Sequence, residues 1–310
     1  MQATGGAAVQ ARPVPPTEQR NPRTLDIDTL PTQELLERLN DEDALVAPAV
    51  RRALPALATV VDEAVRRVRG GGRVHYVGCG TSGRLAVLDA AELLPTFGLP
   101  PGVVVAHLAG GDQALQQAVE GAEDDQAAGA AAVTDVQPGD LVLGLSASGT
   151  ARYVAGALEQ AARSGAFTAL ITSNPAAPLA KLAAVCLCAD TGPEAITGST
   201  RLKAGTAEKT LLNGFSTALM VRTGRTWSNL MVEVTPVNDK LRARQLRLLT
   251  QATGAPAEQC ATALAQAQGD LRVALVALLS GADPDTAQAA VAAAGGVVRD
   301  ALAALSQPGR

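Results

Sequence analysis

Short apolar runs alternate with helical patterns through the middle of the chain. The runs lie at 73–77, 103–108, 140–145, 167–172 and 184–189, and a turn that contains Gly, Ser or Asp follows each of them. Most of these turns lead into a segment whose apolar residues recur at helical spacing. Nearly continuous apolar strands separated by helices indicate a parallel sheet that is covered on both faces. We therefore predict an α/β fold in which ligands bind at the carboxyl ends of the strands.

Helical patterns also precede and follow this alternation. One predicted helix runs from Ala44 to Arg69, and a second, from Ser199 to Val221, has a first turn rich in hydroxyls. The Ala-rich end of the chain has polar breaks and is typical of a small helical bundle. The predicted units are a disordered tail (1–16), an N-terminal helical arm (17–65), a sheet domain (66–229) and a C-terminal helical domain (245–310).

Composition and charge limit the ligands and catalytic groups that we expect. The 310 residues carry a net charge of -4 with scattered basic residues, so we expect no nucleic-acid partner. The two histidines lie inside apolar runs, which argues against a Ser-His-Asp triad or a multi-histidine metal site. The four cysteines lack the spacing of a zinc site and are expected to be reduced. An enzyme with this composition would use carboxylates as its acid and base.

We also expect a cytoplasmic protein that does not enter a membrane. No uninterrupted apolar stretch reaches the roughly 18 residues that a membrane span requires. The first residues contain no apolar core segment, so they do not resemble a signal peptide.

A glycine-rich turn follows the first predicted strand. Gly78, Gly80 and Gly83 form a G-x-G-x-x-G pattern, which is also found in dinucleotide sites. Those sites need an acidic residue at the end of the second strand, and this chain has Ala109-Gly-Gly111 there. The turn instead adds hydroxyls at Thr81 and Ser82, and a purely structural turn is the alternative interpretation.

Two further hydroxyl-rich turns occur at the same predicted edge of the sheet. Helix N-termini bind phosphate through oriented N–H groups and the helix dipole, although a single Ser or Thr there can simply cap the helix. The three turns together favour a phosphorylated small molecule as the ligand. The candidate binding residues are Gly80, Thr81, Ser82, Ser146, Ser148, Gly149, Thr150, Ser199, Thr200 and Lys203.

Two glutamates become candidate catalytic residues only through a family resemblance. The segment from Gly192 to Lys209, GPEAITGSTRLKAGTAEK, resembles the signature shared by N-acetylmuramic acid 6-phosphate etherases and the glucokinase regulatory protein, both of which contain sugar-isomerase (SIS) domains. The resemblance covers about 17–300 and includes TEQRNP, DAAE and AVEGAED. A chain of 310 residues with one such domain is similar to the bacterial etherases.

The resemblance implies a five-stranded parallel SIS sheet, a C-terminal domain similar to ubiquitin-associated bundles, and a homodimer without a cofactor. The apolar face of the 44–69 helix, which we expect to be uncovered, also motivates the dimer. The two catalytic glutamates of the family match Glu92 and Glu123. The chain departs from the family pattern after Gly149, where Thr150-Ala-Arg-Tyr153 replaces the common Arg-Thr-Pro-Tyr.

The implied reaction cleaves the lactyl ether of N-acetylmuramic acid 6-phosphate to give N-acetylglucosamine 6-phosphate and D-lactate. We expect Glu92, among apolar neighbours on a buried helix face, to have a raised pKa and to act as the acid. Glu123 is then the base, and Glu194 is a candidate for substrate binding or ring opening. The alternatives are a regulator that binds a phosphosugar without turnover, and an aldose-ketose isomerase on the same fold.

Overall fold

A five-stranded parallel sheet forms the centre of the molecule. In the computed structural model, which describes residues 14–233 and 239–306, the strand order is β2-β1-β3-β4-β5. Each strand lies within one residue of its predicted boundaries, and the predicted α/β fold is confirmed. The strands are β1 (Val74–Gly78), β2 (Val104–Leu108), β3 (Leu141–Leu145), β4 (Phe167–Thr172) and β5 (Val185–Cys188).

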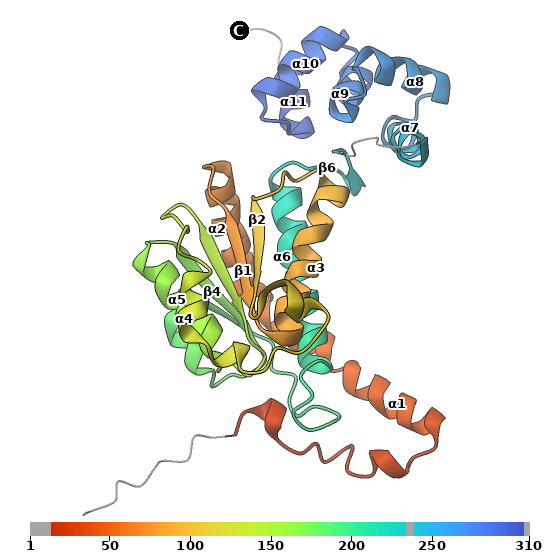
Figure 1. The fold of residues 1–310 in the computed structure, drawn as a ribbon. Coiled ribbons are helices and arrows are strands. Elements are labelled where there is room, and N and C mark those ends of the chain that lie inside the picture. The colour runs from red at the N-terminus through yellow and green to blue at the C-terminus, as the bar shows by residue number, and fades with distance from the viewer. Residues whose placement is uncertain (1–13, 234–238, 307–310) are drawn as a thin grey trace, which may run out of the picture.

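Helices cover both faces of the sheet (Figure 1). On one face lie α2 (Val46–Arg69), α3 (Gly80–Phe97) and α6 (Lys203–Arg222), and on the other lie α4 (Gln126–Ala131) and α5 (Arg152–Arg163). Alternate strand residues enter the two cores because successive side chains point to opposite faces. Leu143, for example, belongs to the core that includes Phe215 of α6, whereas its neighbour Val142 belongs to the core that includes Leu158 of α5.

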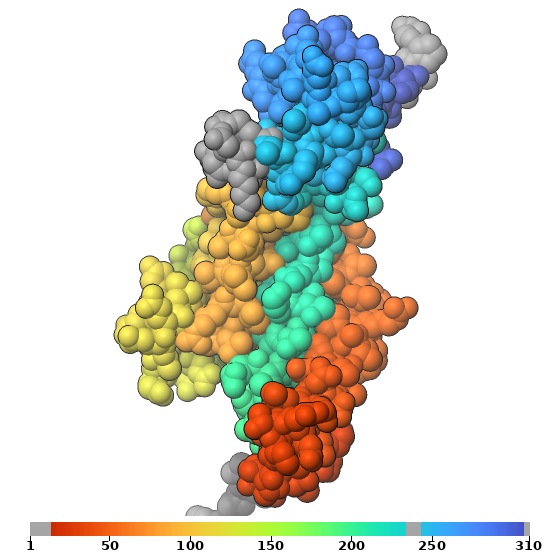
Figure 2. Space-filling view, turned by 90° about the vertical axis from the view of Figure 1, so that its right-hand side faces the viewer, coloured from red at the N-terminus to blue at the C-terminus, as the bar shows by residue number. Residues whose placement is uncertain are grey.

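The remaining elements lie at the two ends of α6, which runs between α2 and α3 (Figure 2). The arm, with α1 (Thr32–Asp43), lies near the start of α6, and the C-terminal helices lie beyond its end. Short 3-10 helices occupy Pro16–Glu18, Ile27–Thr29, Gly111–Leu115, Ala122–Asp124 and Pro178–Leu182. A hairpin of β6 (Thr226–Trp227) and β7 (Leu230–Met231) precedes α7 (Asp239–Thr253), α8 (Ala257–Gln266), α9 (Leu271–Ser280), α10 (Pro284–Ala293) and α11 (Val298–Leu305).

The structure differs from two predicted boundaries, and a third predicted segment lies largely outside the described residues. The long helix α6 begins at Lys203, so the hydroxyl-rich segment predicted to be its first turn precedes it. The C-terminal helices begin with α7 at Asp239, six residues before the predicted boundary of the C-terminal domain. The predicted disordered tail, 1–16, falls largely outside the described residues.

The apolar face of α2 is covered within the chain, which contradicts the uncovered face expected from the sequence. Every buried residue of α2 is apolar, and the helix packs against α6 and β5. Within the described residues, one stretch, Thr32–Arg69, has the length and hydropathy of a membrane span. Its contacts are those of a core helix, because its buried side chains, such as Leu57 and Val60, join the larger core of the fold.

Candidate active site

A cavity of about 420 Å³ lies at the carboxyl edge of the sheet. Three segments that are distant in the sequence form its wall: the turn after β1, the turn after β3 and the segment before α6. Its lining residues are Pro15, Glu18, Cys79, Gly80, Thr81, Ser82, Glu123, Asp124, Leu145, Ser146, Ala147, Ser148, Thr150, Ala151, Gly198 and Thr200. The three predicted hydroxyl-rich segments therefore meet at one cavity.

The glycine turn brings the N-terminus of α3 against the end of β1. A Cβ atom on Gly83 would lie 2.6 Å from the carbonyl oxygen of Gly78, so only glycine permits this close approach. Gly80 has a φ of 51°, a conformation that also favours glycine. No side chain caps α3, so the first N–H groups of this 18-residue helix are directed at the cavity without a capping acceptor.

Residues outside the cavity lining support the turn after β3. The Nδ2 atom of Asn174 donates a hydrogen bond to the carbonyl of Ser148 over 2.8 Å, and Gly149, with a φ of 68°, lies against Ala177. The hydroxyls of Ser148 and Thr150 are 2.7 Å apart. Gly149 thus supports the turn from outside the lining, whereas Ser148 and Thr150 line the cavity.

The segment before α6 places two of the predicted binding residues away from the cavity. Both carboxylate oxygens of Glu194 accept hydrogen bonds from backbone N–H groups, of Lys203 over 3.0 Å and of Ala204 over 2.9 Å. Burial raises the pKa of Glu194 above its usual value despite these bonds. Neither Glu194 nor Ser199 lines the cavity, and Glu194 caps the start of α6.

The ammonium group of Lys203 is also directed away from the cavity. Its Nζ atom lies 2.6 Å from Glu42 of α1, and both side chains are buried. Burial opposes ionisation of Glu42, but hydrogen bonds from Arg23, Lys203 and Asn21 lower its pKa to about 2. The lysine therefore joins the arm to α6 through a buried ion pair.

The described residues that line the cavity include no lysine or arginine. Its ionisable side chains are the carboxyls of Glu18, Glu123 and Asp124 and the thiol of Cys79. Burial, with Glu123 and Asp124 nearby, raises the pKa of Cys79 to about 12, so the thiol is neutral. Anion binding here would rely on hydroxyls and on the N-termini of α3 and α5.

The two glutamates matched to the family do not meet within one chain. Glu123, in the 3-10 helix Ala122–Asp124, lines the cavity with an exposed side chain. Glu92 lies on α3 twelve residues after Gly80, which places it about 18 Å along the helix axis from the cavity. The expectation of a buried Glu92 is wrong: Leu93 faces the core, whereas Glu92 is exposed together with Leu88 and Leu94.

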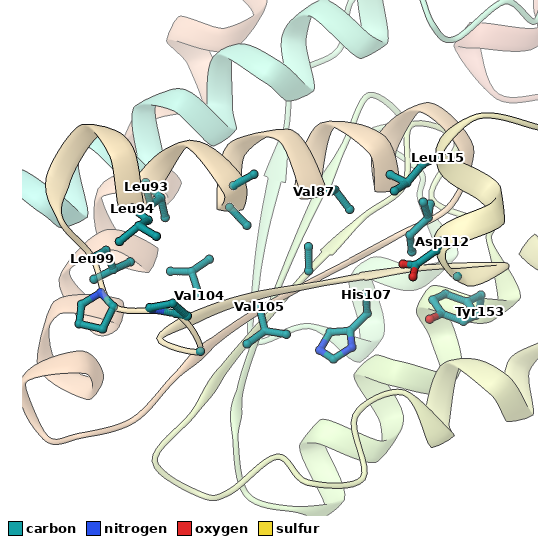
Figure 3. A pocket seen from close by; sticks show the side chains of 18 residues that line it. Val87, Leu93, Leu94, Leu99, Val104, Val105, His107, Asp112, Leu115 and Tyr153 are labelled. Carbon is teal, nitrogen blue, oxygen red and sulfur yellow. The ribbon is translucent and has the colours of Figure 1, made fainter. Parts of the chain in front are cut away.

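A second cavity, of about 720 Å³, lies between α3 and β2 (Figure 3). Val87, Leu94 and Val105 contribute apolar side chains to it, and it contains none of the hydroxyl-rich turns. His107 lines it, and its Nε2 atom lies 2.9 Å from Nδ1 of His75. Burial and His75 lower the pKa of His107 to about 4. No group of three or more metal-ligating side chains occurs in the parts of the chain that the structure describes.

Sequence reasoning missed three carboxyl groups. Glu18 and Asp124 line the cavity, although their surroundings in the sequence are those of surface residues. Glu208 lies behind the cavity wall, where both carboxyl oxygens approach the Oγ atom of Ser82, at 3.0 and 2.8 Å. Its spacing from the buried residues Ala204 and Leu211 was the available signal, since it places Glu208 on the apolar face of the helix.

Comparisons with known proteins give consistent results along the chain. Residues 56–162 match the family model described as the glucokinase regulatory protein N-terminal SIS domain, and residues 115–213 match the SIS domain. The chain is 55% identical to the N-acetylmuramic acid 6-phosphate etherase of Thermobifida fusca, over 86% of this chain and 87% of that protein. It is 48% identical to the etherase of an Enterobacter species, over 92% and 97% of the two chains, and 46% identical to that of Mesorhizobium japonicum, over 93% and 94%.

Proposed function

The chain belongs to the N-acetylmuramic acid 6-phosphate etherase family, and on this basis we propose that it cleaves the D-lactyl ether of N-acetylmuramic acid 6-phosphate. The products are N-acetylglucosamine 6-phosphate and D-lactate. The observation that carries the proposal is the cavity that Glu123 lines together with residues of three hydroxyl-rich segments. It joins a candidate catalytic carboxylate to the parts of a phosphate site.

The phosphate of the substrate binds to the turns after β1 and β3. Ser82, Ser148 and Thr150 supply hydroxyl donors, and the uncapped start of α3 supplies N–H groups and a favourable dipole. The carboxylates of the lining repel the phosphate, so the sugar lies with its phosphate toward the turns and its reacting carbons toward Glu123.

Two carboxyl groups are enough for the reaction. Once the sugar ring has opened, the C1 aldehyde makes the proton on C2 acidic. A carboxylate removes that proton, the C3–O bond breaks with protonation of the departing lactate, and water then adds to C3 to give the product. Two glutamates with different pKa values can supply the base and the acid.

Glu123 is the base and Glu92 is the acid in this proposal. The cavity supports the role of Glu123, because the side chain lines it beside the polar turns. The exposure of Glu92 in the single chain removes the burial that the sequence suggested, so its role rests on the family match.

Deuterium exchange separates the roles: Glu92→Gln should still exchange the C2 proton with deuterated water, and Glu123→Gln should not. The reverse pattern would interchange the acid and the base.

The distance between the glutamates supports a homodimer with a shared site. Glu92 lies about 18 Å from its own cavity along α3, and Leu88, one turn earlier, is 49% exposed. Both features are consistent with α3 lying at an interface with a second copy of the chain. Glu92 would then enter the cavity of that second copy. Light scattering over a wide concentration range tests the dimer, and a persistent mass of 31.4 kDa would exclude it.

Release of D-lactate from N-acetylmuramic acid 6-phosphate by the purified protein, without added metal or cofactor, tests the activity. Tight binding without lactate would favour the phosphosugar-binding regulator. Interconversion of aldose and ketose phosphates without lactate would favour the isomerase. We also propose that the protein acts in the cytoplasm, where its four free thiols would stay reduced.

A further inference from the structure

A buried carboxyl group lies directly behind the cavity wall. Glu208 is on the second turn of α6, 1% exposed, and its two oxygens lie 3.0 and 2.8 Å from the Oγ atom of Ser82. Ser82 lines the cavity at the third position of α3. Glu208 therefore contacts the cavity only through this hydroxyl, which we have assigned to the phosphate of the substrate.

No cation neutralises Glu208 among the described residues. The elements that make extensive contacts with α6 are α1, α2, α3 and β4, and their ionisable groups are engaged elsewhere or exposed. Glu42 of α1 holds Lys203, and Asp89 of α3 is bound by the hydroxyls of Tyr76 and Ser216. The buried residues of α2 are all apolar, β4 contains no ionisable residue, and Lys209, which follows Glu208, is exposed.

Burial has a clear consequence for the charge of this carboxyl. It raises the pKa of Glu208 to about 8, and only the Ser82 hydroxyl acts in the opposite direction. A carboxyl group without a cation is most stable as the neutral acid when it is removed from water. Glu208 thus carries a proton at neutral pH, and that proton is available for a hydrogen bond.

The proton decides the direction of the bond to Ser82. An ionised Glu208 can only accept, so it would take the Ser82 hydroxyl hydrogen and leave the oxygen lone pairs facing the cavity. A neutral Glu208 donates its own O–H to Ser82, whose hydrogen is then free to point at a phosphate oxygen. We propose that Glu208 is a positioning residue that holds Ser82 as a hydrogen-bond donor to the substrate's phosphate.

This proposal rests on the proposed function, and it deepens the account of the same site. It explains how a cavity whose described lining has no lysine or arginine can tolerate a further glutamate near a phosphate dianion. It also predicts a pH dependence of binding. Phosphate monoesters are mostly dianions above about pH 7, so a loss of affinity at higher pH would report the protein and not the ligand.

The test is calorimetric titration of the full-length protein with N-acetylglucosamine 6-phosphate from about pH 7 to about pH 9.5. The parent should bind at least about ten-fold more weakly at the upper limit, because ionisation of Glu208 reverses the Ser82 hydroxyl. Glu208→Gln should retain binding with a flat profile, since an amide N–H donates to Ser82 at every pH. Glu37→Gln, a change at an exposed glutamate of α1, should keep the profile of the parent.

A flat profile in the parent, or the same alkaline loss in Glu208→Gln, would overturn the proposal. If the parent does not bind this sugar phosphate at any pH, the proposed function fails instead. An infrared difference spectrum between the parent and Glu208→Gln then tests Glu208 without a ligand. The band of a protonated carboxyl at about pH 7 supports the neutral acid, and a carboxylate band at that pH contradicts it.

Discussion

Two buried glutamates near the start of α6 show opposite behaviour. Glu42 accepts hydrogen bonds from Arg23, Lys203 and Asn21, which lower its pKa to about 2, whereas burial raises the pKa of Glu208 to about 8 with only the Ser82 hydroxyl as partner. Both side chains are almost fully removed from solvent. The two carboxyls also differ in their partners: Glu42 accepts hydrogen bonds from two cationic groups and an amide, whereas Glu208 meets one neutral hydroxyl.

The same contrast divides the roles of this part of the fold. Lys203, the one lysine at the start of α6, neutralises Glu42 and joins the arm to the sheet domain. The cavity side of α6 consequently keeps no cation for Glu208. Region by region, the arm contact is a structural ion pair, and the wall behind Ser82 is a neutral hydrogen-bonding unit. Separate substitutions can change each of these two units.

The largest effect is expected from the ion pair. Glu42→Gln leaves the Lys203 ammonium buried without its counter-ion, which should lower the free energy of unfolding by about 3–5 kcal/mol. The double variant Glu42→Gln/Lys203→Met should lose clearly less, because neither member of the pair remains as an unpaired buried charge. Urea unfolding measures both, with Glu37→Gln as a control on the same helix. Equal losses in the single and double variants would contradict the coupling.

The second effect is on the pH dependence of stability, and its sign differs between the two glutamates. The raised pKa of Glu208 contributes stability below its unfolded value of about 4.3, and this is lost as pH rises through about 8. The lowered pKa of Glu42 contributes stability above that unfolded value, and this is lost as pH falls through about 2.

Between about pH 5 and about pH 7 the parent should therefore lose about 2–3 kcal/mol of unfolding free energy relative to Glu208→Gln. The gap between the two proteins should stop growing above about pH 8, where Glu208 is ionised in both states. Urea unfolding at a series of pH values measures it. A gap that does not change with pH would mean that Glu208 is ionised in the folded protein at neutral pH.

The smallest effect is expected from a single hydroxyl of the cavity. Ser148→Ala should weaken sugar-phosphate binding by about 1.5 kcal/mol, roughly ten-fold, through loss of one hydrogen bond to a charged group. Thr150 lies 2.7 Å from Ser148 and can partly replace it. Calorimetric titration at about pH 7 measures this, and Ser280→Ala in the C-terminal domain is the control. Unchanged binding in both Ser148→Ala and Ser82→Ala would place the phosphate elsewhere.

The sequence predicted the sheet well because the strands are apolar and the three central ones, β1, β3 and β4, are buried on both faces. Apolar runs bounded by turns defined all five strands, and the position of each turn after a strand placed Ser82 and Ser148 at one edge. Parallel topology brings the carboxyl ends of the strands together without any knowledge of side-chain contacts. This part of the site therefore follows from local pattern and fold class.

The contacts that set charge could not be predicted in this way. Lys203 meets Glu42 across 161 residues and Glu208 meets Ser82 across 126, and periodicity does not identify such pairs. The leucines and alanines that flank Glu92 in the sequence suggested that it was buried. Several of these neighbours, including Leu88 and Leu94, are exposed in the single chain, so local apolar content does not tell a core face from a face turned outward.

Mixed dimers of two inactive variants test most directly the central claim that each cavity combines its own Glu123 with Glu92 of a second chain. Glu92→Gln and Glu123→Gln should each lower turnover by about 10²–10⁴. After unfolding and refolding together in equal amounts, heterodimers should contain one site with both glutamates, so D-lactate release should recover to about a quarter of the parent's. If both glutamates served a site within one chain, every site would keep one substitution, and the mixture would stay as inactive as its components.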